Sequence, residues 1–147
     1  MLLIMKIKIL SVKLGSVAMG KNARDYNILG RLENDQEIEI FDFQPLDIRA
    51  YENKTLDCLI FAWMRKIRDN NKYLIKGKFI ENFLIPSKWL ECDSSLKGRS
   101  YPAVETAYGY FLIDPEEYDN SYLEAKDGDT IEFDGFRLDL VSYLLTD

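Results

Sequence analysis

The chain has 147 residues, of which 47% are hydrophobic and 30% are charged, a composition typical of a globular protein and not of a disordered one. It contains no histidine and only two cysteines, Cys58 and Cys92, which excludes Ser-His-Asp and Cys-His nucleophile systems and the usual zinc sites. The net charge of −6 disfavours attraction of the whole chain to nucleic acid or to anionic membranes. We expect a single domain over residues 1–147, without a cofactor or a bound metal.

The first part of the chain has the period-two pattern of β-strands. Residues 5–14 alternate at first, with Met5, Ile7 and Ile9 on one face, and predict a strand. The runs 26–32 and 37–43 are separated by a short polar break, which predicts a β-hairpin.

Residues 55–69 fit two interpretations. As a helix, they carry an apolar stripe at helical spacing, and Thr55 stands where an N-cap is expected. As a strand, the apolar run 58–64 leads through the polar turn 69–72 into a second strand over 73–83, which would form a hairpin. Because a continuous apolar run matches any period, we prefer the hairpin and keep the helix as the alternative.

The second part of the chain begins with a long connection over 86–102. A strand is predicted over 103–113, and the sequence Asp-Pro-Glu-Glu that follows is typical of a helix start, which predicts a short helix near 115–123. A last strand is predicted over 130–141, where Gly135 shifts the apolar register by one residue and indicates a β-bulge.

These elements predict a mainly β fold, a single small barrel or Greek-key sandwich of six or seven strands with the short helix near 115–123. An OB-like barrel is the specific expectation. The alternative is an α+β fold with an additional helix at 55–69.

One segment imitates a nucleotide-binding motif. Residues 15–21 satisfy the phosphate-loop pattern G-x-x-x-x-G-K, but Asn22 stands where a hydroxyl should reach magnesium. The segment that follows alternates like a strand, whereas a phosphate loop needs a helix there. We interpret residues 15–21 as a loop between strands. No carboxylate pair stands out for acid–base chemistry, so we expect no enzymatic activity.

Acidic residues concentrate near the C-terminus, where residues 101–147 carry twelve acidic and two basic side chains. Their spacing matches no calcium-binding loop. We predict an acidic surface that binds a basic partner protein. Its candidate residues are Asp114, Glu116, Glu117, Asp119 and Asp127.

The connection 86–102 combines aromatic and basic side chains, which single-stranded nucleic-acid binders use for base stacking and phosphate contact. The candidate residues for this second surface are Lys76, Lys78, Lys88, Trp89, Arg99 and Tyr101. Anchoring of Trp89 in the core is the competing interpretation.

The favoured function is a non-catalytic, cytoplasmic binding protein of bacterial type that contacts another protein, as an inhibitor, an immunity-type protein or an accessory subunit. The alternative is an OB-like protein that binds single-stranded nucleic acid through residues 86–102. No membrane contact is expected, since no apolar window is long enough to span a bilayer. Without histidine, stability and binding should vary little between about pH 6 and pH 8.

Overall fold

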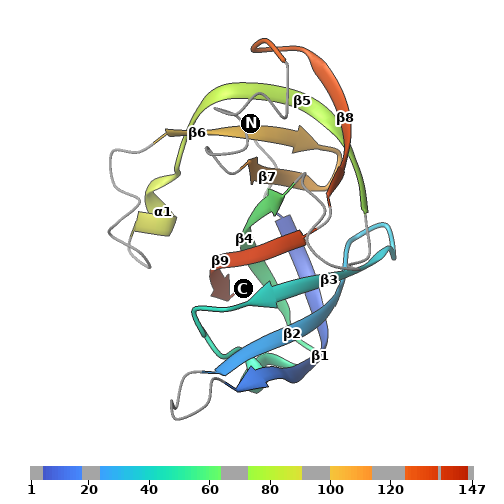
Figure 1. Cartoon of the computed structure of the whole chain (residues 1–147), viewed down its shortest axis with the longest axis vertical. Coiled ribbons are helices and arrows are strands. Elements are labelled where there is room, and N and C mark those ends of the chain that lie inside the picture. The colour runs from blue at the N-terminus through green and yellow to red at the C-terminus, as the bar shows by residue number, and fades with distance from the viewer. Residues whose placement is uncertain are drawn as a thin grey trace.

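The computed structural model describes residues 5–17, 24–63, 73–90, 100–113, 125–135 and 137–145, and these are mainly β, as expected (Figure 1). The strands are β1 (Met5–Val17), β2 (Arg24–Arg31), β3 (Glu37–Asp42), β4 (Thr55–Trp63), β5 (Tyr73–Leu84), β6 (Ser100–Thr106), β7 (Gly109–Ile113), β8 (Thr130–Gly135) and β9 (Arg137–Leu145). The 3₁₀ turn η1 (Arg49–Tyr51) lies between β3 and β4, and the one-turn helix α1 (Ser87–Leu90) follows β5.

Five strands close into a small barrel in the order β1-β2-β3-β9-β4, and β4 also pairs with β1. All neighbours in the barrel are antiparallel except β3 and β9, which are parallel. A parallel pair needs a long crossover instead of a tight hairpin, and here the chain between β3 and β9 supplies it. A five-stranded Greek-key barrel of this order is OB-like.

The remaining four strands form an inserted sheet between β4 and β9 along the chain. Its order is β7-β6-β5-β8, and a parallel pairing between β7 and β4 joins it to the barrel. In Figure 1 the barrel fills the lower half of the molecule, and the long strand β5 arches across the upper half. The insertion therefore extends the barrel wall beyond its five strands.

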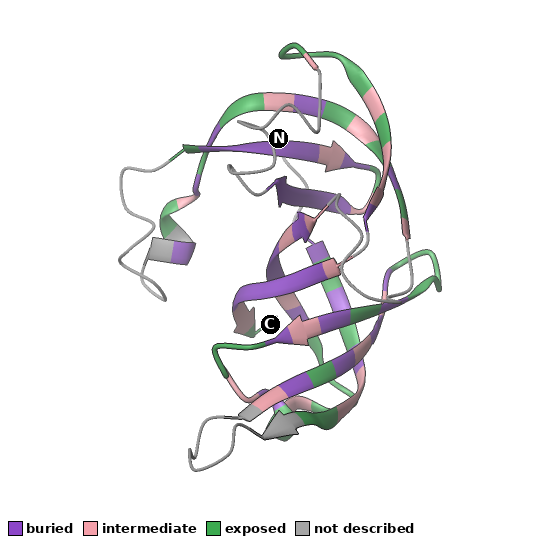
Figure 2. Ribbon diagram, in the orientation of Figure 1, coloured by how far each residue is buried: buried purple, intermediate pink, exposed green. Residues whose placement is uncertain are grey.

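Burial follows the sequence pattern closely (Figure 2). Along β3 the glutamates are exposed, and Ile38 and Ile40 point into the barrel core. All five residues of β7 are buried, because Phe111 packs into the barrel cluster while Tyr110 and Leu112 pack into a second cluster. A strand covered on both faces is apolar throughout.

The predicted strands are present, but two of the seven predicted runs, 103–113 and 130–141, each form two strands. The run 103–113 is broken by a tight turn at residues 107–108, where Gly109 has φ +138° and a Cβ would lie 2.7 Å from the Met5 Cα. The predicted bulge at Gly135 is wrong: β8 pairs with β5, whereas β9 pairs with β3 and β4, so the chain changes sheets there. This is why the described residues form nine strands, whereas six or seven were expected.

The stretch 55–69 is a strand over 55–63, so the alternative helix is wrong for that part. The predicted hairpin with 73–83 is also wrong, because β4 pairs with β1, β7 and β9, and β5 pairs with β6 and β8. β4 therefore pairs with strands that are distant in the sequence and not with β5, the strand that follows it. The expected helix near 115–123 and the turn 69–72 lie outside the described residues.

Candidate functional site

An arginine lies among three aromatic rings on the outer face of the barrel. The guanidinium carbon of Arg137 is 4.7 Å from the Phe41 ring centroid, 5.6 Å from that of Phe43 and 5.8 Å from that of Trp63. The Phe41 and Phe43 rings are stacked, with centroids 6.1 Å apart. We call Phe41, Phe43, Trp63 and Arg137 the aromatic–arginine platform. Such cation–π contacts contribute about 0.5–1 kcal/mol each where they are exposed, and more where they are desolvated.

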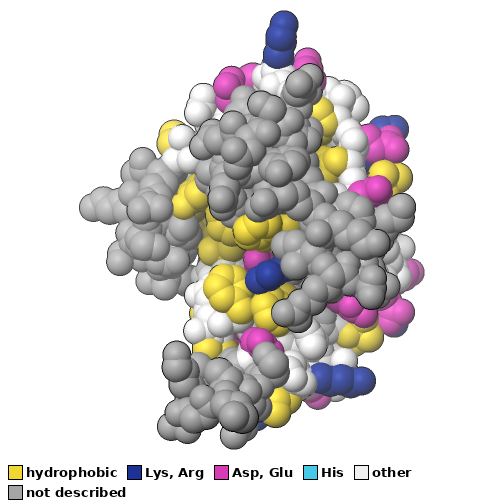
Figure 3. Space-filling model, in the orientation of Figure 1, with side chains coloured by type: hydrophobic (Ala, Val, Ile, Leu, Met, Phe, Trp, Pro, Cys, Tyr) yellow, Lys and Arg dark blue, Asp and Glu magenta, His cyan; other side chains and the backbone are white. Residues whose placement is uncertain are grey.

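Three neighbouring strands bring these residues together. In the β4–β9 ladder Trp63 lies opposite Arg137, and in the β3–β9 ladder Phe41 lies opposite Asp139. Because alternate residues of a strand share a face, Arg137 and Asp139 both point outward. Figure 3 shows hydrophobic side chains around a basic one in the region of β3 and β9.

Asp139 orients the platform from beneath. It is only 4% exposed, and one carboxylate oxygen accepts from Arg137 Nε at 2.6 Å while the other accepts from Trp63 Nε1 at 2.7 Å. Charge-assisted bonds of this kind are short and strong, and they fix both the guanidinium and the indole. No described residue accepts a hydrogen bond from the two terminal nitrogens of Arg137, so these donors can serve a ligand.

The loop that carries Phe43 is also fixed. The buried carboxylate of Asp42 accepts from the backbone amides of Leu46 and Asp47, and the side-chain amide of Gln44 donates to the carbonyl oxygens of residues 140 and 141. Phe43 nevertheless remains 53% exposed. An exposed aromatic ring on a pre-ordered loop loses little entropy on binding.

A second arginine–aspartate pair, Arg49 and Asp47, lies next to this loop. Its two residues are two positions apart in the sequence, like those of the pair in the platform. Arg49 donates to both carboxylate oxygens of Asp47 and lies 5.1 Å over the Tyr26 ring. This hydrogen bonding from Arg49 lowers the pKa of Asp47 below its ordinary value. Both side chains are far more exposed than those of Arg137 and Asp139. The Arg49 pair therefore offers a matched control for the platform.

The structure places only part of the predicted acidic surface. Asp127 is exposed in the turn before β8, and its carboxylate accepts from the Glu81 backbone amide at 2.9 Å. The other four candidates, Asp114, Glu116, Glu117 and Asp119, lie outside the residues that the structure describes.

The predicted basic and aromatic surface is not assembled as expected. Trp89 and Tyr101 are buried, and Trp89 Nε1 donates to the Tyr110 hydroxyl at 2.9 Å, so neither ring is open for base stacking. Lys76 and Lys78 are exposed on β5, but Glu132 and Glu105 are their cross-strand neighbours. The Lys88 side chain and all of Arg99 fall outside the described part.

Sequence reasoning missed the platform because its members come from residues 41, 43, 63 and 137. The available signals were the Phe-Asp-Phe triplet at 41–43 and the alternation that gives Arg137 and Asp139 one face. Neither signal indicates that Trp63 joins them, since that depends on the β4–β9 register.

Other chemistry finds little support in the described residues. Burial raises the pKa of the Cys58 thiol well above its ordinary value, which makes it a poor nucleophile. No group of three histidine, cysteine, aspartate or glutamate residues in the described segments is placed to hold a metal ion. No helix within these segments has the length and apolar character needed to cross a membrane.

Comparisons of the chain with protein-family models, with curated proteins and with solved structures gave no match.

Proposed function

We propose that this chain is a non-catalytic binding module that recognises another protein, and that the aromatic–arginine platform is its central contact. The observation that carries the proposal is the fixed, partly open cluster of Arg137 with three aromatic rings. Tryptophan and arginine dominate the energetic centres of protein interfaces, because they combine a large apolar area with directed hydrogen bonds. An inhibitor, an immunity-type protein or an accessory subunit of a larger complex would use such a surface.

Charge favours a protein over a nucleic acid as the partner. Glu37 and Glu39 are exposed on the same outward face of β3 as Phe41, and Arg137 is the one cation of the platform. Strong binding of a phosphate backbone needs several cations, because its affinity comes from the release of many counterions. A partner with an acidic or aromatic residue facing Arg137 and basic residues facing the glutamates is complementary.

The acidic residues of 101–147 extend this proposal. Asp114, Glu116, Glu117, Asp119 and Asp127 would speed the approach of a basic partner, since charge complementarity acts mainly on association rates and specificity. A cytoplasmic location is part of the same proposal.

The test compares two arginine variants that remove similar contacts. Immobilised wild type, Arg137→Ala and Arg49→Ala are used to capture proteins from an extract of the native host, and affinity for the captured protein is then measured by calorimetry. We expect Arg49→Ala to bind like wild type and Arg137→Ala to lose about tenfold or more in affinity. Equal binding by Arg137→Ala would remove the platform from the interface.

The alternative function, single-stranded nucleic-acid binding, is favoured by the OB-like barrel and by rings on which bases could stack. A fluorescent single-stranded oligonucleotide is titrated at low and at moderate salt. Binding that weakens with salt and that Arg137→Ala reduces would replace the protein partner by a nucleic acid.

A further inference from the structure

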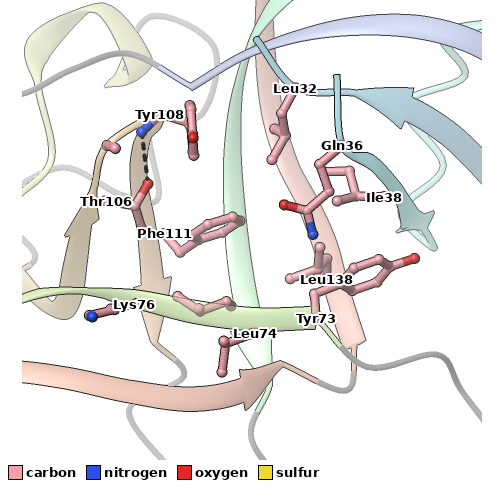
Figure 4. A pocket seen from close by; sticks show the side chains of 12 residues that line it. Leu32, Gln36, Ile38, Tyr73, Leu74, Lys76, Thr106, Tyr108, Phe111 and Leu138 are labelled. Atoms are coloured by element: carbon pink, nitrogen blue, oxygen red, sulfur yellow. Dashed lines mark hydrogen bonds between the residues drawn. The ribbon is translucent and has the colours of Figure 1, made fainter. Parts of the chain in front are cut away.

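A cavity of about 260 Å³ lies between the barrel and the inserted sheet (Figure 4). The turn between β2 and β3 forms one side, and the start of β5 and the turn between β6 and β7 form the others. Most of the described lining residues are apolar, and they include the aromatic rings of Tyr73, Tyr108 and Phe111. None of the platform residues lines it.

The walls of the cavity are held in place by hydrogen bonds. The Tyr73 hydroxyl accepts from the Glu39 backbone amide at 2.7 Å. On the other side, the Thr106 hydroxyl accepts from the Tyr108 amide and donates to the Gly109 carbonyl oxygen at 2.6 Å. The cavity is thus pre-formed, as small-molecule sites usually are.

The lining also carries polar side chains, among them Gln36, Lys76 and Tyr108. The Gln36 side chain points into the cavity in Figure 4, and its terminal amide has no hydrogen-bonding partner among the described residues. An amide offers a donor and an acceptor together, which suits the edge of a heterocycle. Among the described lining residues Lys76 is the single charged one, and its charge disfavours a cationic ligand.

We propose that this cavity binds a planar, uncharged or anionic heteroaromatic ring of bicyclic size, such as a purine or an indole. A cavity of about 150 Å³ lined by aliphatic and aromatic residues already holds benzene, so the larger volume here admits two fused rings. The aromatic walls favour a flat ligand through stacked or edge contacts. The Gln36 amide would favour a heterocycle over a hydrocarbon of the same shape.

The first experiment titrates adenine, indole and naphthalene into the wild-type chain and follows binding by ligand-observed NMR. We expect nuclear Overhauser contacts from bound ring protons to the methyl groups of Leu32, Ile38 and Leu138, and tighter binding of the heterocycles than of naphthalene. In Gln36→Leu this preference should fall about tenfold, because the ring edge loses its partner. An unchanged preference in Gln36→Leu would overturn recognition by the amide.

A second variant fills the cavity from its rim. Ala107 lines the cavity and is exposed, so Ala107→Trp should occupy the space without disturbing the core. We expect it to abolish binding of all three rings, whereas Leu84→Ala, at an exposed position outside the cavity, should bind like wild type. Binding that survives in Ala107→Trp, or no binding of any heterocycle to wild type, would overturn the proposal. Contacts to the methyl groups of Leu32, Ile38 and Leu138 decide the location if Ala107→Trp does not fold.

Discussion

The outward face of β4 and β9 has two regions, one covered by the inserted sheet and one partly exposed to solvent. Leu59, Phe61 and Val141 are covered there by the inserted sheet and belong to the cluster around Trp89. Trp63, the last residue of β4, lies opposite Arg137, the first residue of β9. Both belong to the platform and remain partly exposed. Aromatic residues occupy both regions, so coverage by the insertion separates a core from a surface.

Each of the two tryptophan indoles donates a hydrogen bond to another side chain. Trp89 Nε1 donates to Tyr110, and Trp63 Nε1 donates to Asp139. What differs is their exposure to solvent: Trp89 is fully buried, whereas Trp63 is half-buried and Phe43, another ring of the platform, is 53% exposed. Pre-ordered aromatic residues without a cover are typical of binding surfaces.

The largest difference between the two regions is expected when one ring is removed from each. Trp89→Ala should lower the free energy of unfolding by about 3–5 kcal/mol, because it leaves a cavity and an unpaired Tyr110 hydroxyl. Phe43→Ala should cost less than about 1 kcal/mol, since its ring is already half in solvent. Urea unfolding followed by circular dichroism measures both. Similar losses in the two variants would mean that the platform is a structural cluster.

The second prediction tests the carboxylate beneath the platform. Asp139→Asn keeps the size of the side chain but leaves one acceptor oxygen for two donors, Arg137 Nε and Trp63 Nε1. We expect a loss of about 1–3 kcal/mol in the free energy of unfolding, because a buried donor loses its charged partner. Partner affinity should fall with it, as the guanidinium is no longer held. Calorimetric melts and the capture assay measure the two effects.

Much of the fold could be predicted from the sequence, because alternation marks the strands. The alternation at 37–43 and the polar break before it define β3 and its hairpin with β2. The strand partners of β4 could not be predicted, since β9 lies some 80 residues further along and local pattern holds no information about it. The turn at 107–108 was missed because its neighbours are apolar, and Gly109 was the single clue.

The candidate site was less predictable than the fold. Trp89 and Tyr101 lie in a segment whose composition resembles an exposed loop, but their burial depends on Tyr110 and Phe61, which come from other strands. The platform likewise exists only after β3, β4 and β9 have paired.

The inward face of β4 carries a thiol whose burial makes stability depend on pH. Cys58 points into the barrel core, and burial there raises the pKa of its thiol above the ordinary value of 9.0. When the pKa of a group is higher in the folded than in the unfolded protein, its contribution to stability is fully present at any pH below the unfolded pKa. That contribution decreases as pH rises above the unfolded pKa, because the unfolded protein then loses the proton first. The free energy of unfolding should therefore fall above about pH 9, by up to about 1.4 kcal/mol per pH unit. Cys58→Ala should lack this part of the slope in urea titrations between pH 8 and 10, and equal slopes would contradict it.

The smallest expected effect concerns the exposed arginine pair beside the platform. Asp47 has a lowered pKa through its hydrogen bonds from Arg49, so this pair contributes stability above 3.8, the ordinary value, and the contribution is lost as pH falls through the lowered pKa. Because both side chains are largely exposed, Arg49→Ala should leave the thermal midpoint at neutral pH almost unchanged. NMR titration of the Asp47 carboxyl should nevertheless show its pKa rising toward 3.8 in that variant. A pKa that stays low without Arg49 would mean that backbone hydrogen bonds set it, and Arg49→Ala would then match Arg137→Ala less closely as a control.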